Sequence, residues 1–531
     1  MDAADILRDH DQMETERLRY DPIWDEIARL VLPRHEVFAT GKREGTRPKA
    51  PDTNLYSSAG SLALDRFGAA VVWMLCPTGQ RWHSLRGPDS VDGRADGPEA
   101  RAYLESLRDL LFRYRQRGGF EGCFHEISVQ LGAFGTGCLY VEEMPGGRVR
   151  YEAVPLSEIW VARSAWGKID KVHRKYQLSA RAAVQAFGDD CPPKIAEKAE
   201  KPGSTEEQFW FLHCVKPGKK GMQYASYHVD MDGKTVVREG GYRRLPYMVG
   251  RLTLAPGETY GRSPAWQVLP ELRMVNAISK TALISKNRLA EPAWLTADIA
   301  TGAPLRLTPN AINPGWVDPV TGRPLALPMQ ITGNPEAADD ELDRRHETIN
   351  DAFMIRLFQI LVETPTMTAT EVLERAREKA ALMSPTMGRL QSEILEPMIW
   401  REIDVLEESG VLEDELGPIP EELLGGPWRI DYESTLARDM RADDATAITR
   451  TIEQLAGIAQ LRPEIYDAFD LELAAVELAK ANGMPAKLMR TPEQIKALQA
   501  ERIQAAQTAQ LVEAMPAVTD AARAANEIGV M

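Results

Sequence analysis

Residues Ser263 to Leu289, SPAWQVLPELRMVNAISKTALISKNRL, contain the clearest helix start in the chain. A serine followed by proline is typical of an N-cap with proline at the first helical position. Apolar residues then recur every three or four positions, as on one face of an amphipathic helix: Val268, Leu272, Val275, Ile278 and Leu283. The stretch therefore predicts one long helix, and the segments on its two sides differ in character.

The segment before this helix begins helical and then becomes β-rich. Two apolar stripes end at Pro33 and Pro77, and two further helices are predicted at 99–116 and 121–134. Glycines at 132, 135 and 137 end the last of these and lead into a hairpin with strands at 138–142 and 148–154.

Residues 159–251 show mainly the alternation of β-strands. Strands are predicted at 172–176, 208–216, 222–229 and 235–239, and Asp232-Gly233 is a strong hairpin turn. One short helix is predicted at 180–187. The segment 191–206, rich in Pro, Lys and Glu, is predicted to be an exposed loop.

The segment after Leu289 returns to helix. Short strands are predicted within 291–335, a helix at 340–362, and a break at 363–367. Thr368 then opens a long helix with capping-box spacing that runs to Gly410, with Pro385 and Pro397 expected to kink or divide it. Further helices are predicted from 439 to the end. The fold class predicted is α+β, predominantly helical.

Composition narrows the classes of protein that this chain can represent. The 531 residues are 44% hydrophobic and 27% charged, which excludes a disordered chain. The net charge of −15 excludes a passive nucleic-acid binder held by phosphate contacts. Five cysteines without a CxxC pair support neither a disulfide framework nor a zinc ribbon. No signal peptide or membrane span is expected, which favours the cytosol.

No motif of catalysis or cofactor binding is complete in this sequence. A P-loop is absent, the glycines at 132–137 have the wrong spacing for a dinucleotide site, and no GxSxG is present. His125 and His346 each precede a glutamate, but the residues four positions later are Val129 and Asn350. We therefore predict no catalytic residue, no metal site and no cofactor. The alternative left open is a metal-dependent nuclease that uses the acidic residues between Glu413 and Glu422.

Three groups of residues carry a family resemblance. The first is YDPIWDEIARLVLP (20–33) with RFGAAVVWMLCPTGQRWHSL (66–85), the second is GETYGRSPAWQVLPELRMVN (257–276), and the third is TATEVLERAREKAALMSPTMGRLQSEILEPMI (368–399). Their order and spacing resemble the head-to-tail connector, or portal, family of short-tailed bacteriophages. Other virion proteins, such as a tail adaptor or a scaffold, remain alternatives.

The resemblance implies a structural protein of the virion. Such proteins form a ring, usually of twelve copies, at one capsid vertex, through which a separate terminase packages double-stranded DNA and from which the DNA is ejected into the tail. The implied partners are other copies of the chain, the terminase large subunit, tail adaptor and tail tube proteins, the scaffold and the major capsid protein. The ring would assemble in the host cytoplasm, without a membrane and without catalysis.

The resemblance also implies wing, clip, stem and crown regions. On this basis we expect a helical wing with a β-hairpin at 1–160, a β-rich region with the clip at 161–262, a stem helix at 263–290, wing strands with the channel loop and long helix at 291–438, and a crown at 439–531.

Two sets of residues are candidates for functional roles. Arg356, Thr364, Thr366 and Thr368 lie around the break that resembles the channel-facing loop, with helix capping or plain surface as the alternative. Leu390, Ile394 and Met398 belong to a helix with more apolar surface than one neighbouring helix covers, so they are candidates for the boundary between subunits. A core within one subunit is the alternative for these three.

Overall fold

The computed structural model divides the chain into two compact units. One unit comprises residues 1–80 with 113–410, and the other residues 81–112 with 411–531. The residues that the structure describes are 2–32, 54–87, 98–144, 146–218, 222–296, 305–308, 310–329, 335–355, 385–424, 428–432, 448–455 and isolated positions between 474 and 504.

Helices dominate the start of the larger unit, as predicted. They are α1 (Ala3–Arg17), α2 (Asp21–Val31), α3 (Ala59–Leu75) and α5 (Phe120–Phe134), while α4 (Pro98–Gly118) runs across both units. α5 ends at Gly135, whose φ of +78° is a left-handed conformation that favours glycine. A Cβ at this position would lie 2.4 Å from the carbonyl carbon of Arg262, so the close approach of the chain also requires glycine there.

A three-stranded antiparallel sheet follows α5. The predicted hairpin is present as β2 (Thr136–Met144) and β3 (Arg148–Val154), and β9 (Tyr247–Arg251) pairs with the other edge of β2. The strand order is therefore β3-β2-β9, which joins segments that are far apart in the sequence into one sheet.

A five-stranded antiparallel sheet forms between β3 and β9 in the sequence. Its strands follow chain order: β4 (Ile159–Arg163), β5 (Ile169–Ser179), β6 (Gln208–Pro217), β7 (Tyr224–Asp230) and β8 (Thr235–Tyr242). The predicted helix at 180–187 is present between β5 and β6 as α6 (Ala180–Phe187).

The segment 191–206 contains a helix, so the prediction of an exposed loop there is wrong in part. This helix is α7 (Pro193–Glu200). It forms because Pro193 suits the first turn of a helix, and because Ile195 gains a buried site in the cluster with Ala183 and Phe187 of α6.

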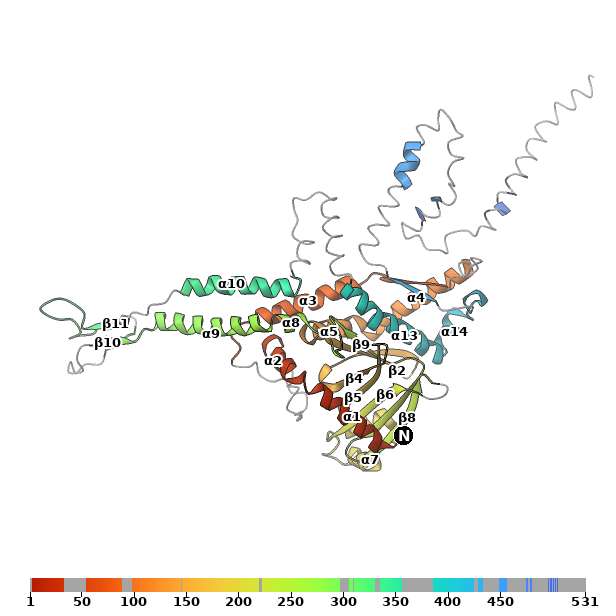
Figure 1. Cartoon of the computed structure of the whole chain (residues 1–531), viewed down its shortest axis with the longest axis horizontal. Coiled ribbons are helices and arrows are strands. Elements are labelled where there is room, and N and C mark those ends of the chain that lie inside the picture. The colour runs from red at the N-terminus through yellow and green to blue at the C-terminus, as the bar shows by residue number, and fades with distance from the viewer. Residues whose placement is uncertain are drawn as a thin grey trace, which may run out of the picture. The chain divides into compact units, whose positions relative to one another are not determined.

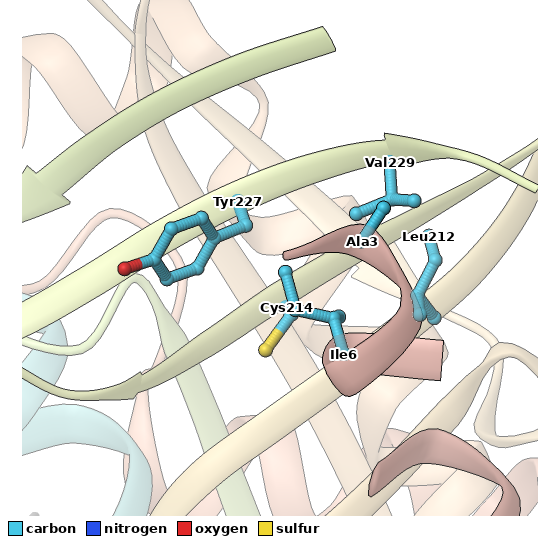
Figure 2. Close-up of a cluster of buried hydrophobic side chains, with 6 residues drawn as sticks. All are labelled: Ala3, Ile6, Leu212, Cys214, Tyr227 and Val229. Atoms are coloured by element: carbon cyan, nitrogen blue, oxygen red, sulfur yellow. The ribbon is translucent and has the colours of Figure 1, made fainter. Parts of the chain in front are cut away.

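Helix α1 covers one face of the five-stranded sheet. Ala3 and Ile6 pack against alternate side chains of β6 and β7, as Figure 2 shows: Leu212, Cys214, Tyr227 and Val229. α1 was not predicted from the sequence, because its apolar residues are few and their burial comes from the sheet that the helix meets.

The rest of the larger unit contains a pair of long helices and a helix with a wide turn. The elements, in order, are α8 (Pro264–Gln267), α9 (Leu269–Ala290), β10 (Trp294–Thr296), β11 (Ala326–Pro328), α10 (Pro335–Ala352), the π-helix η4 (Gln391–Leu395) and α13 (Glu396–Glu408). In Figure 1, α9 and α10 lie side by side with β10 and β11 beyond their ends. The predicted α+β, mainly helical class is confirmed.

The smaller unit pairs two distant strands. β1 (His83–Arg86) is antiparallel to β12 (Arg429–Tyr432), and α14 (Val411–Leu416) and a short 3-10 helix, η5 (Glu421–Leu423), precede β12. The ring of Trp82 lies 5.7 Å from that of Phe112 and 6.5 Å from that of Tyr432. Across the described parts of both units, none of the helices has the length and apolar character needed to span a lipid bilayer.

Candidate functional site

Helices α9 and α10, with the β10–β11 hairpin between them, form a feature that we call the arm (residues 269–352). The predicted N-cap before the arm is present: the hydroxyl of Ser263 accepts a hydrogen bond from the backbone N–H of Trp266 at 2.9 Å. This residue caps the short α8, and α9 begins separately at Leu269, so the single helix predicted over 263–289 is divided at Val268. The same hydroxyl donates to the carbonyl of Ala133 at 2.8 Å. Ser263 therefore both caps the first turn and ties it to the end of α5.

Two ion pairs fix the position of α10 along the length of α9. The ammonium of Lys286 lies 2.9 Å from the carboxylate of Asp339, and the guanidinium of Arg345 lies 2.5 Å from that of Glu271. Both pairs are partly or largely exposed, so solvent screening limits their contribution to stability. They show that the two helices run antiparallel, with the end of α9 beside the start of α10.

Charge is divided unevenly between the two helices of the arm. α9 contains four basic residues and one acidic residue, whereas α10 contains seven acidic residues and two basic ones. Neighbouring helices of one hairpin thus carry opposite net charge. This asymmetry is visible in the sequence, but it gains meaning only once the two helices are known to pair.

The far end of the arm exposes many large apolar side chains. In the hairpin itself, Leu295 is 59% exposed and its cross-strand partner Leu327 is 55% exposed. The surrounding segments expose Leu307, Ile312, Val317, Val320 and Met329. Isolated exposed apolar residues are ordinary, but a concentration at one end of an element is typical of an interaction surface.

The base of the arm is anchored to α2. The guanidinium of Arg273 makes two hydrogen bonds of 2.5 Å to the carboxylate of Glu26, and these hold the pKa of Glu26 below its ordinary value. The side chain of Asn276 accepts from the backbone N–H of Tyr56 at 2.7 Å and donates to the carbonyl of Asn54 at 3.0 Å. α9 therefore leaves the body of the unit at a defined place.

The helix that contains α13 includes a π-helical turn directly before a proline. The backbone N–H of Glu396 donates to the carbonyl of Gln391, five residues earlier, in place of the usual four. Pro397 has no N–H, and its ring would crowd the carbonyl of residue 393 in a regular α-helix. The wider turn relieves this conflict, so the expected disturbance at Pro397 takes the form of a π-turn.

The three candidates for the subunit boundary lie inside the subunit. Leu390, Ile394 and Met398 are each 0% exposed within this single chain. Ile394 lies against β9, where a Cβ added to Gly250 would be 2.2 Å from its Cδ1 atom. Their apolar side chains are thus buried within the chain itself, in agreement with the alternative of a core inside one subunit.

Buried ion pairs hold this helix to its neighbours. Arg115, near the end of α4, makes hydrogen bonds of 2.6–3.1 Å to the carboxylate of Glu402, which also accepts from the hydroxyl of Tyr151 at 2.5 Å. Arg115 and Glu402 are 3% and 1% exposed. Burial, with the neighbouring Glu402 carboxylate, raises the pKa of Tyr151 well above its ordinary value, so the phenol remains a donor.

The channel candidates Arg356, Thr364, Thr366 and Thr368 lie outside the described residues. The acidic residues considered for a metal site do lie within them: Glu413, Asp414, Glu415, Glu421 and Glu422 are all exposed. In the described ranges, no group of three or more His, Cys, Asp or Glu side chains is arranged to hold a metal ion. The geometry therefore gives no support to the nuclease alternative.

The pairing of α9 with a second helix was not predicted from the sequence. The stem was expected to be one helix and 291–335 to be part of the wing, whereas the structure places this segment between two antiparallel helices. The strands within 161–262, where the clip was expected, pack with α1 and form part of a compact sheet. The acidic run of α10 was the available indication of a second, differently charged helix.

Comparison with known proteins gives the family. The family described as "Bacteriophage head to tail connecting protein" matches residues 3–489. The portal protein of Salmonella phage epsilon15 is 24% identical, over 98% of this chain and 95% of its own length. The probable portal protein of Bordetella phage BPP-1 is 26% identical, over 94% and 91%. A chain from the neck of an empty gene transfer agent particle aligns over 74% of this chain and 86% of its own, with 13% identity and a TM-score of 0.34. Because the family match covers nearly the whole sequence, this chain belongs to the bacteriophage head-to-tail connecting proteins.

Proposed function

We propose that copies of this chain form a closed ring at one vertex of a phage capsid, and that double-stranded DNA passes through its channel. The observation that carries this proposal is the family match over residues 3–489, together with relatives named as portal proteins that align along almost their whole length. The DNA enters during packaging and leaves toward the tail.

The role of the chain in this process is structural. A separate terminase supplies the work of packaging, and the ring provides the opening and the attachment surface. The exposed acidic residues between Glu413 and Glu422 then contribute to the negative charge of the ring and not to a catalytic centre.

The arm supplies the stem and the clip in this proposal. The stem consists of α9 together with α10, and the clip is the far end of the arm, around β10 and β11. This assignment differs from the sequence-based one, and its support is the exposed apolar surface around Leu295 and Leu327. The remaining helices and sheets of the larger unit form the wing, and residues 439–531 stay assigned to the crown.

The negative charge of the chain suits a channel for DNA. Each lysine or arginine bound to phosphate releases counterions and adds affinity, which movement of the DNA would have to overcome at every step. With a net charge of −15 per chain, the assembled ring does not hold the duplex through bulk attraction.

The partners follow from the position in the virion. The clip would meet the terminase large subunit during packaging and the tail adaptor and tail tube proteins afterwards. The wing would contact the scaffold during assembly and the major capsid protein in the finished particle. Neighbouring copies would meet through two different faces, because heterologous contacts are what close a ring.

Electron microscopy of the purified full-length chain tests this function. The expected result is a ring with a central opening wide enough for a DNA duplex, and no cleavage of linear DNA in the presence of Mg²⁺. A chain that remains monomeric at all concentrations and salt conditions would overturn the proposal. DNA cleavage that is lost when Glu413 and Glu421 are replaced with glutamine would favour the nuclease instead.

A further inference from the structure

The outer surface of α9 carries a basic stripe. Ala277, Lys280, Ile284 and Arg288 follow one another at spacings of three or four residues, so they share one side of the helix. All four are exposed, and Ile284 and the adjacent Leu283 are 40% and 49% exposed. The stripe therefore combines positive charge with apolar surface that the described parts of the chain leave open to solvent.

The outer surface of α10 carries an acidic stripe. Asp340, Asp343, Glu347 and Asp351 also recur every three or four residues, and all four are exposed. The exposed Arg344 lies on the same side, so the stripe is acidic in balance: four carboxylates and one guanidinium. Its excess of negative charge is greatest at Asp340 and Asp343, and a basic surface would complement it there.

The two stripes lie at overlapping levels along the arm. Within the chain, Lys286 pairs with Asp339 and Glu271 pairs with Arg345. Along the arm, Lys280 of α9 therefore lies between these two ion pairs. Asp340 and Asp343 lie at the same level on α10. When arms stand side by side in a ring, the α9 stripe of one copy is thus level with the α10 stripe of the next.

We propose that neighbouring copies bind each other along the arm, with the basic stripe of α9 in one copy against the acidic stripe of α10 in the next. This inference rests on the ring proposed above. A ring needs two different, mutually complementary faces on every copy, and the two stripes meet that requirement. The exposed Leu283 and Ile284 favour a protein partner over DNA, because a phosphate backbone would leave this apolar surface uncovered.

Individual ion pairs at such a surface are weak, but they repeat at every boundary of the ring. Water and salt screen each exposed pair, so no single pair decides whether the ring closes. Reversing the charges of one stripe replaces attraction with repulsion at every boundary. We therefore expect the fraction of the chain found in rings to fall about tenfold or more.

The experiment uses two charge-reversed forms of the full-length chain. One carries Lys280→Glu with Arg288→Glu, and the other carries Asp340→Lys with Asp343→Lys. Each alone should form far fewer rings than the unchanged chain in sedimentation velocity at about 0.15 M salt. An equimolar mixture should restore rings, and native mass spectrometry should find the two forms in a 1:1 ratio, because alternation places opposite charges at every boundary.

Matched controls on and directly after α7 carry the same changes in net charge. Lys194→Glu with Lys201→Glu, and Glu197→Lys with Glu200→Lys, should form rings as the unchanged chain does. Circular dichroism and thermal unfolding check that all variants fold. Rings from each reversed form alone would overturn the inference while leaving the ring itself intact, and so would a mixture that restores none. Absence of rings from the unchanged chain would instead overturn the proposed function, and the inference with it.

Discussion

The guanidinium of Arg251 and the carboxylate of Glu393 join the last strand of the three-stranded sheet to the π-turn of a helix 142 residues later. Arg251 donates from Nη2 at 2.6 Å and from Nε at 3.2 Å, and its backbone N–H donates to the same carboxylate at 2.9 Å. The side chains of Arg251 and Glu393 are only 5% and 19% exposed. The carboxylate of Glu393 therefore accepts hydrogen bonds both from the last backbone N–H of β9 and from a nearly buried guanidinium.

Replacing Glu393 with glutamine should destabilise the chain markedly. The amide keeps the shape but removes the charge, which leaves Arg251 buried without its counterion. Breaking a buried pair costs about 3–5 kcal/mol, and the partial exposure of Glu393 places our expectation at about 2–3 kcal/mol. Urea unfolding followed by circular dichroism measures the change. The exposed pair Lys198–Glu207 is the control, and Glu207→Gln should change stability by less than about 0.5 kcal/mol.

The effects of substitutions at Gly250 and Ile394 on the free energy of unfolding should not be additive. Gly250→Ala places a methyl group 2.2 Å from Cδ1 of Ile394, and such overpacking costs about 1–3 kcal/mol. Ile394→Ala leaves a cavity in the core and costs about 2–5 kcal/mol. In the double variant the new methyl group occupies part of that cavity. The two costs should therefore sum to more than the measured loss, by about 1 kcal/mol. Simple additivity in urea unfolding would show that the two residues do not touch.

Ser263→Ala should weaken α8, the short helix directly before the arm. The change removes the cap on the N–H of Trp266 and leaves the carbonyl of Ala133 without this donor, and Ser263 is 0% exposed. We expect a loss of about 1–2 kcal/mol in the free energy of unfolding, measured in urea. Ser263→Thr retains the hydroxyl and should recover part of it. If the alanine and threonine variants are equally stable, the hydroxyl has no capping role.

Local sequence rules predicted the elements whose boundaries are set by local chemistry. Ser263 with Pro264, Gly135, and the ends of α6 all have conformational preferences that do not depend on distant contacts. The π-turn before Pro397 has the same origin, since proline removes a specific hydrogen bond.

Features that depend on distant contacts were not predictable in this way. α7 and α1 owe their burial to neighbours outside the helix itself, such as Phe187 and Leu212. Leu390 and Ile394 have the apolar periodicity of an interface and of a core alike, and only the position of β9 distinguishes the two. Likewise, nothing in the spacing of residues 291–335 indicates that a second helix returns along α9.

Burial of a histidine makes the larger unit sensitive to acid. His10 on α1 is 1% exposed, and its ring lies 4.7 Å from that of Trp160 and 5.7 Å from that of His173. Among the described residues, neither of its ring nitrogens has a hydrogen-bond partner. Burial lowers the pKa of His10 to about 4, with Lys175 and Arg17 acting in the same direction and Asp9 opposing them.

The pH dependence follows from the difference between the folded and unfolded states. Above about pH 6.5 the ring is neutral in both states and has no effect. As the pH falls from about 6.5 to about 4, the unfolded chain binds the proton first, so the folded state loses about 3 kcal/mol relative to it. His10→Leu should remove this loss. In urea unfolding at about pH 7 and about pH 4, the variant should lose about 3 kcal/mol less stability than the unchanged chain. An equal loss in both chains would mean that His10 is hydrated and protonates as readily in the folded state as in the unfolded one.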